Sequence, residues 1–171
     1  YGPMIPVPTA PEPPTITNVA ANSNGSVTVT WSHNANDGGS ALTSWSIWAY
    51  KDGDDPEVAA NLIGPARPSP DGPATTGTVT GLASFARYRF IVADHNAVGE
   101  GFRSAPSDVV MSYANTIFVK NSSGTDSSTC GTIAVPCKTV DHAFTRIGSM
   151  TNPTIALAGS EAFGHLAGFL L

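Results

Sequence analysis

The sequence predicts an all-β protein: a β-sandwich followed by a smaller β segment with one short helix. Two observations lead to this fold class. Short stretches in which small polar and apolar residues alternate recur through the first two-thirds of the chain, and this pattern is typical of half-buried strands. Between them lie clusters of Gly, Asp, Asn and Pro, which favour tight turns. Several short strands separated by such turns indicate a sandwich.

The first 14 residues form a proline-rich linker or tail. Proline at this density favours an extended polyproline II conformation and is excluded from the interior of a sheet. A terminal tail is usually disordered unless something holds it. We therefore expect a contact here, with a neighbouring molecule as one candidate. The prolines that we assign to this interaction are Pro6, Pro8 and Pro11.

From Thr15 onward the period changes to two, and four segments read as strands. They are residues 26–31, 44–49, 76–80 and 88–92. Trp45 and Trp48 are separated by an odd number of positions, so they must point to opposite faces of a sheet. We expect Trp45 in the core and Trp48 on the surface, where an indole can stack on a sugar ring or a protein partner.

Residues 11–113 resemble a fibronectin type III domain. The resemblance implies a seven-stranded sandwich over residues 15–113. It also implies a tyrosine corner, in which a phenol caps a backbone turn upstream. The features that carry it are Pro13-Pro14, Trp31 at the end of the second strand, the run 81–92 (GLASFARYRFIV) and the segment 96–104 (NAVGEGFRS).

Two features depart from the family pattern. Asp94 stands where the family usually has a small apolar residue. The stretch from Asp52 to Thr76 is long and rich in proline, so we expect a projecting loop or an extra hairpin there, free to touch a partner. An adhesion module that recognises a protein ligand through this loop is one functional hypothesis, although the chain has no Arg-Gly-Asp motif.

The two cysteines, Cys130 and Cys137, lie seven positions apart in a loop rich in Gly, Ser and Thr. A metal site would need more ligands, and only His142 is near in sequence. We therefore predict a disulfide, which implies an oxidising compartment. Closing so short a loop stabilises the fold by roughly 2–3 kcal/mol in the chain-entropy description.

Residues 114–171 form the third part of the chain. Residues 115–160 resemble the start of a pectin-lyase-like parallel β-helix, in their opening strand, their Gly-x-Asp loop and their Pro-x-Lys-Thr corner. Apolar residues at i, i+3, i+4 and i+7 predict a one-sided helix over 139–148, which Gly148 can end. Residues 153–158 then read as a buried strand.

A β-helix rung cannot bury its apolar face alone, so several stacked rungs are needed. This segment supplies too little chain for a core of its own, and its end is apolar. Three explanations compete: the sequence is a fragment of a longer protein, the segment packs on its own sandwich, or it pairs with a neighbouring chain through free sheet edges. The tail residues that we assign to an interaction surface are Phe163, Phe169, Leu170 and Leu171.

The composition points to an extracellular or cell-surface protein and excludes several classes of function. Charged residues make up 12% of the chain, against roughly 25% in typical soluble domains. The net charge is −5, and the eight Lys and Arg residues form no cluster, which argues against nucleic acid. No apolar run is long enough to span a membrane. The chain begins at Tyr1 without a signal-peptide pattern, so we expect a processed product or a piece of a longer chain.

No catalytic, metal or cofactor site is predicted. The four histidines are far apart in sequence, whereas a metal site needs several ligands that converge. The acidic cluster at Asp52, Asp54 and Asp55 lacks the spacing of a calcium loop. No nucleophile-elbow motif is present. We therefore expect that the chain is not an enzyme.

Two sequons for N-linked glycans occur, at Asn24 and Asn121. Together with the apolar tail and the proline-rich start, they lead to our main hypothesis. It is an extracellular, glycosylated structural protein that self-associates as a homo-oligomer or as a subunit of a surface filament or appendage. The alternative is an accessory carbohydrate- or protein-binding module of a larger polysaccharide-active or adhesion protein.

Overall fold

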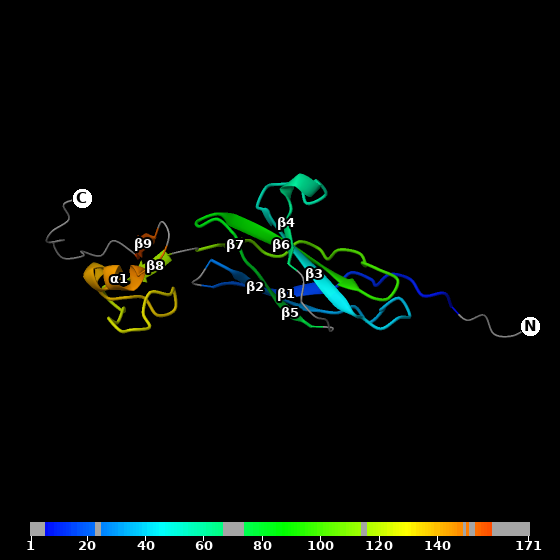
Figure 1. The fold of residues 1–171 in the computed structure, drawn as a ribbon, viewed down its shortest axis with the longest axis horizontal. Coiled ribbons are helices and arrows are strands. Elements are labelled where there is room, and N and C mark those ends of the chain that lie inside the picture. Colours follow the sequence, from blue (N-terminus) through cyan, green and yellow to red (C-terminus); the bar gives the residue numbers. More distant parts are fainter. Residues whose placement is uncertain are drawn as a thin grey trace, which may run out of the picture.

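The computed structural model describes residues 6–22, 25–66, 74–113, 116–148, 150 and 153–158. These residues form a sandwich followed by a smaller C-terminal unit, which lies at the end of the molecule opposite the N-terminus (Figure 1). The elements are β1 (Thr15–Ala21), β2 (Val27–Ser32), β3 (Ser44–Lys51), η1 (Ala59–Asn61), β4 (Ile63–Ala66), β5 (Thr76–Val79), β6 (Arg87–His95), β7 (Val110–Met111), β8 (Thr116–Val119), α1 (Val140–Ile147) and β9 (Thr154–Leu157).

The sandwich contains seven strands within the described residues, as the sequence predicts. One sheet has the strand order β1-β2-β5 and the other has β4-β3-β6-β7, with all pairs antiparallel. The inner faces of the two sheets enclose the main core. The four strands predicted from the two-residue period correspond to β2, β3, β5 and β6, so those predictions are confirmed.

Strand β2 shows why the alternating pattern produces a sandwich. Val27, Val29 and Trp31 are buried on its inner face, while the threonines between them are only partly buried. The Trp31 ring meets the Trp45 ring of the facing sheet edge to face, with the ring centroids 5.2 Å apart. Aromatic pairs favour this geometry because the ring edge is positive and the ring face negative.

The expected tyrosine corner is present before β6. Tyr88 is 1% exposed, and its hydroxyl oxygen accepts a hydrogen bond from the backbone N–H of Ala83 at 3.0 Å. The phenol thereby satisfies a donor in the turn that leads into β6. The sequence run 81–92 predicted this contact correctly.

Two serines in the segment before the short strand β7 accept hydrogen bonds from backbone N–H groups of β6. The N–H groups of Val92 and Phe90 donate to the hydroxyls of Ser104 and Ser107, each at 3.0 Å. Both serines are buried. Because Pro106 has no N–H and interrupts a regular ladder, these hydroxyls satisfy backbone donors that a strand partner would otherwise take.

Asp94, the departure noted in the sequence, is 1% exposed and faces the inside of the sandwich. Its Oδ2 lies 2.8 Å from Nδ1 of His33, which follows β2 in the opposite sheet. Within the described residues its Oδ1 has no hydrogen-bond partner. A buried carboxyl group therefore depends on one partly exposed imidazole, and this contact joins the two sheets at one end of the core.

The C-terminal unit is built on a parallel pair of strands. β8 and β9 run parallel, and α1 lies in the connection between them. A small core of its own contains Ile117, Val119, Ala143 and the two cysteines. The expectation that this segment cannot form a core is therefore wrong for its described part. The predicted helix is confirmed, and so is a strand within 153–158, but the expectation that this strand is buried is wrong, because its residues are half-buried and Leu157 is exposed.

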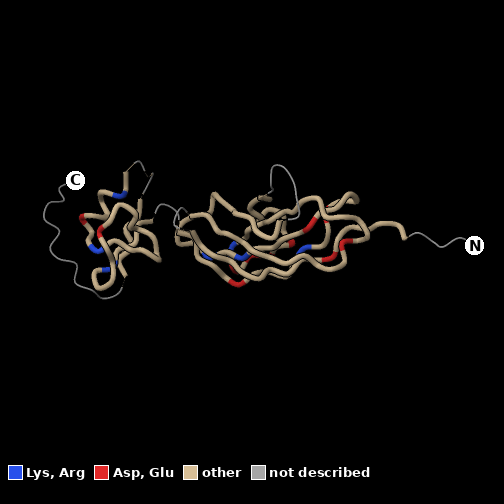
Figure 2. Tube along the Cα trace, turned by 90° about the horizontal axis from the view of Figure 1, so that it is seen from below, with Lys and Arg blue, Asp and Glu red and all other residues tan. Residues whose placement is uncertain are grey.

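Charged residues are scattered over both units between long uncharged stretches (Figure 2). This arrangement follows from the low fraction of charged residues in the chain. The surface is therefore made largely of uncharged polar and apolar groups.

The His33–Asp94 contact yields an asymmetric stability prediction. His33→Ala should lower the free energy of unfolding by about 3 kcal/mol, because it leaves a buried carboxyl group without its partner. Asp94→Ala should cost less, because the imidazole that remains is 21% exposed, whereas the carboxyl group is buried. The double variant should recover most of the loss caused by His33→Ala. Urea unfolding at neutral pH measures all three values, and a larger loss for Asp94→Ala than for His33→Ala would contradict this account.

Candidate interaction surfaces

The predicted disulfide between Cys130 and Cys137 is present. Both residues are buried, and their Cα atoms are 4.9 Å apart. The alternative of a metal site at these cysteines is therefore wrong. Cys137 also lies beside β8, where it forms a parallel bridge with Val119. The bond thus fixes the loop 130–137 against the central strand of the C-terminal unit.

Asp126 joins the loop after β8 to the residues at the start of α1. Its Oδ1 accepts hydrogen bonds from the N–H groups of Lys138 and Thr139, at 2.9 and 3.0 Å. Its Oδ2 accepts a third from the Thr139 hydroxyl at 2.8 Å. Desolvation raises the pKa of the Asp126 carboxyl group, but the hydrogen bonds from Thr139 and Lys138 outweigh this effect. The pKa is therefore lowered from its ordinary value of 3.8.

Helix α1 begins and ends as its sequence requires. The Thr139 side chain accepts a hydrogen bond from the N–H of His142 and caps the first turn. Gly148 ends the helix with a positive φ of 50°, a conformation that glycine adopts without steric cost. Of the four residues predicted on the inner face, Ala143 is buried and Val140 and Ile147 pack on the core, but Phe144 is exposed.

The outer edge of β9 has no neighbouring strand among the described residues. The N–H of Ala158 donates to the carbonyl of Val119 at 2.9 Å. Because backbone groups alternate in direction along a parallel strand, the N–H groups of Ile155 and Leu157 face away from β8. Large apolar side chains are also exposed on this unit: Ile133, Val135, Phe144, Met150 and Leu157.

The proline-rich segment is held by its own sandwich. The N–H of Thr9 donates to the carbonyl of Gly38, and the N–H of Phe102 donates to the carbonyl of Pro11. Pro11 is fully buried, so its assignment as a free interaction residue is wrong. Pro6 and Pro8 are exposed, and their role in an interaction remains a prediction.

Trp48 is buried, contrary to the expectation that it lies on the surface. It points to the face opposite Trp45, as predicted, but it is only 6% exposed. It belongs to a second apolar cluster on the outer face of the sheet, against which Leu62 packs. The Arg103 guanidinium lies 4.5 Å from the centre of its ring. Trp48 is therefore not available to stack on a ligand in this structure.

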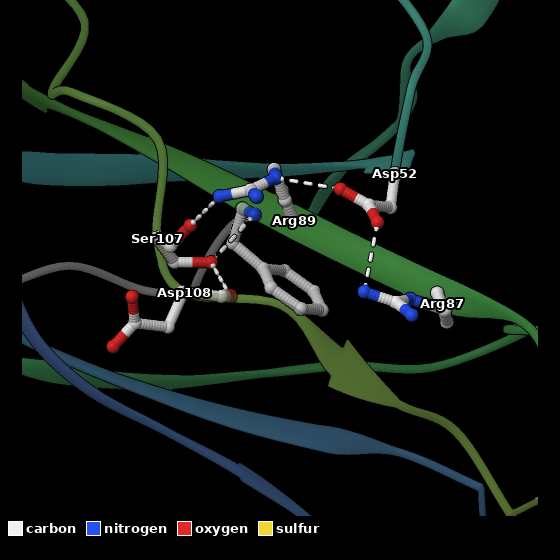
Figure 3. A network of polar contacts seen from close by, with 6 residues as sticks. Asp52, Arg87, Arg89, Ser107 and Asp108 are labelled. Atoms are coloured by element: carbon white, nitrogen blue, oxygen red, sulfur yellow. Dashed lines mark hydrogen bonds and ion pairs between the residues drawn. The ribbon is translucent and has the colours of Figure 1, made fainter.

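A polar network lies beside this cluster (Figure 3). Asp52 accepts from Nε of Arg89 at 2.8 Å and lies 3.2 Å from Nη2 of Arg87. Arg89 also donates to the carbonyl of Ser107 at 2.8 Å. Burial raises the pKa of the nearby Tyr50 phenol; Arg89 acts to lower it and Asp52 to raise it. The network links β3, β6 and the segment before β7, so we interpret it as structural.

The loop after β3 projects from the sandwich in its described part (Figure 1). Most of its residues up to Asn61 are exposed, including Val58. Its second half, residues 67–73, lies outside the described residues. Recognition of a partner through this loop remains a prediction.

Several predicted site residues cannot be placed. Asn24, Phe163, Phe169, Leu170 and Leu171 lie outside the described residues. Asn121 is exposed and lies in a turn directly after β8. The contacts of Asp94 and Asp126 were not predicted from the sequence, because their partners come from other segments of the chain. The one available sign of the first contact was an acidic residue at position 94, where the family usually has a small apolar one.

Within the described parts of the chain, no group of three or more His, Cys, Asp or Glu side chains could hold a metal ion. None of the helices described is long and apolar enough to cross a membrane.

The sequence model of the fibronectin type III domain matches residues 10–110. This chain belongs to the fibronectin type III family. The seven-stranded sandwich and the tyrosine corner agree with this assignment. A search of curated proteins found no match.

Solved structures with similarity to this chain include domains A168–A170 of titin, at 27% identity and a TM-score of 0.47 over 62% of this chain. A structure of titin kinase and its flanking domains has 27% identity and a TM-score of 0.48 over 60%. The chicken CNTN1 FN1–FN3 domains have 18% identity and a TM-score of 0.46 over 60%. The matched region spans 33%, 17% and 32% of those chains, respectively.

Membership in this family sets the coarse function. Fibronectin type III domains are typical of structural and adhesion modules, commonly mediate protein interactions and are generally not catalytic. The domain and the disulfide are consistent with an extracellular location. The resemblance of residues 115–160 to a pectin-lyase-like β-helix has no support from these comparisons.

The lowered pKa of Asp126 predicts an acid-sensitive C-terminal unit. The carboxylate contributes stability above its ordinary pKa of 3.8, and that contribution is lost as the pH falls through the lower folded pKa. Asp126→Asn should therefore destabilise the unit at pH 6, and its difference from the wild type should shrink toward pH 2. Thermal unfolding followed by NMR signals of α1 measures this. A difference that stays constant between pH 6 and pH 2 would contradict the proposed role of the charge.

Proposed function

We propose that this protein is an extracellular structural protein that self-associates through its C-terminal unit. The observation that carries the proposal is the outer edge of β9, which has no neighbouring strand among the described residues and where the N–H groups of Ile155 and Leu157 face away from β8. Such an edge can accept a further strand, since each outward N–H and C=O gains a hydrogen bond when a strand is added.

Exposed apolar side chains lie on both sides of the β8–β9 pair. Leu157 of β9 is 52% exposed, and Ile133 and Val135 of the disulfide loop, on the side of β8 away from β9, are 60% and 45% exposed. Large apolar groups gathered on so small a unit favour burial against another surface. Two β9 edges that pair with each other form an isologous contact, which closes as a dimer. A filament or surface appendage forms where the β9 edge of one copy pairs with a different strand edge of the next, because such a head-to-tail contact does not close.

An alternative follows from the direction of the strands. β8 and β9 are parallel, and Cys137 adds a parallel bridge on the other side of β8. Stacked parallel strands are typical of a β-helix, so the strand that pairs with β9 could belong to the same polypeptide in a longer, polysaccharide-active or adhesion protein. The sandwich would then be its accessory module.

One experiment separates these readings. Size-exclusion chromatography with light scattering is run over a range of concentrations, and hydrogen exchange is measured at the amides of Ile155 and Leu157. Oligomers with slow exchange at these amides support self-association. A monomer with slow exchange supports pairing within one polypeptide. A monomer with fast exchange contradicts both.

Leu157→Pro should return the oligomer to a monomer. The substitution removes an outward N–H but leaves the bonds to β8, which come from the alternate residues of β9. Phe102→Ala is the matched control, because Phe102 is also a highly exposed apolar residue but lies on the sandwich. Electron microscopy of both variants checks for filaments. Filaments that persist in Leu157→Pro would exclude the β9 edge as the contact.

We also propose that Asn121 carries an N-linked glycan in a secretory host. Its sequon lies in an exposed turn, where a transferase can reach it. Treatment with a glycosidase that removes N-linked glycans should lower the mass of secreted protein by one glycan more in the wild type than in Asn121→Gln. Equal losses of mass in the two proteins would disprove the modification at Asn121. A glycan at Asn24 would be removed from both proteins, so it does not affect the comparison.

A further inference from the structure

Phe85 has a backbone conformation that bulky residues avoid. Its φ is 56°, and it is the one non-glycine residue with a positive φ among the described residues. Glycine adopts this region freely, whereas a side chain with a Cβ is strained there. The N–H of Phe85 donates to the carbonyl of Ser112 at 2.8 Å, which helps to hold the turn in place. A strained conformation persists only where contacts with the surrounding structure hold it, so we expect contacts of Phe85 beyond the turn.

Packing of the Phe85 ring in the core of the sandwich does not account for this backbone conformation. It is 47% exposed and does not belong to the main core. Instead it meets the ring of Tyr113 edge to face, with centroids 5.9 Å apart and planes at 84°. Tyr113 in turn meets Phe118 of β8, with centroids 5.1 Å apart and planes at 81°.

This series of three rings, Phe85–Tyr113–Phe118, crosses from the sandwich to the C-terminal unit. A second contact lies beside it: the hydroxyls of Ser84 and Thr116 are 3.2 Å apart. Both contacts involve neighbours in the same strained turn, Ser84 and Phe85. The turn before β6 therefore contacts the C-terminal unit directly through Ser84 and indirectly, by way of Tyr113, through Phe85.

A pocket of about 230 Å³ lies beside these contacts and is lined by Ala21 and Asn22 of the sandwich and by Phe118 and Ile133 of the C-terminal unit. The three rings and the hydroxyl pair are contacts at this junction that can hold the orientation of the two units.

We propose that Phe85 couples the two units: its strained backbone places an aromatic ring where it fixes the orientation of the C-terminal unit on the sandwich. A glycine at this position would relax the turn but would lose the ring contact. The role assigned to Phe85 is thus one of positioning between units, separate from stability of either unit and from the proposed assembly.

Residual dipolar couplings measured by NMR test the proposal. In the wild type, the couplings of β2, β3 and β6 and those of β8 and α1 should fit one alignment tensor. In Phe85→Gly they should require two, while the thermal midpoint of the sandwich stays the same or rises. Leu157→Pro can be introduced in all samples to keep them monomeric, so that failure of the assembly proposal does not affect this result.

Phe102→Ala is again the matched control, since Phe102 is an exposed phenylalanine of the sandwich outside the ring series. It should keep the single tensor. Two tensors in the wild type, or a single tensor in Phe85→Gly, would overturn the proposal. A drop in the thermal midpoint of the sandwich in Phe85→Gly would also overturn it, because Phe85 would then stabilise the sandwich itself.

Discussion

Side chains of a strand point alternately to its two faces, and the rest of this structure depends on how each face is covered. The inner faces of the two sheets cover each other and form the main core. The outer face of the four-stranded sheet carries Trp48, which is covered by Leu62 and Arg103. The C-terminal unit is less completely covered. Among the described residues, α1 covers one side of β8 and β9, and large apolar groups around the two strands stay exposed.

Local features of this fold were predictable from the sequence, whereas burial of a residue by segments distant in sequence was not. The strands β2 and β3 follow from a two-residue period, the tyrosine corner follows from the run that ends at Val92, and the disulfide follows from two nearby cysteines. The burial of Trp48 was missed because an alternating pattern gives the face of a residue but not what lies over that face. Pro11 was missed for the same reason, since the groups that enclose it come from segments distant in sequence, such as that of Gly101.

The C-terminal unit shows how a short segment compensates for a small core. Little apolar area can be buried by so few residues, and small folds therefore need other ties. Here the disulfide joins the two ends of one loop, and the Asp126 carboxylate joins a second loop to the start of α1. The disulfide and these hydrogen bonds hold the backbone in place without burying the strand edge or the apolar side chains. A unit stabilised in this way can keep an open strand edge and exposed apolar groups, whereas a unit stabilised by burial alone would not.

The orientation between the two units decides the direction in which further copies would add at the outer edge of β9. If the C-terminal unit turned freely on the sandwich, strand addition at β9 would join copies without a defined direction. Phe85 and Ser84 sit in one turn and contact Tyr113 and Thr116 at the junction. With the junction fixed, each copy added at β9 would present its own edge at a set angle. The strain at Phe85 and the outer edge of β9 then have complementary roles, since the first sets the geometry that the second would repeat.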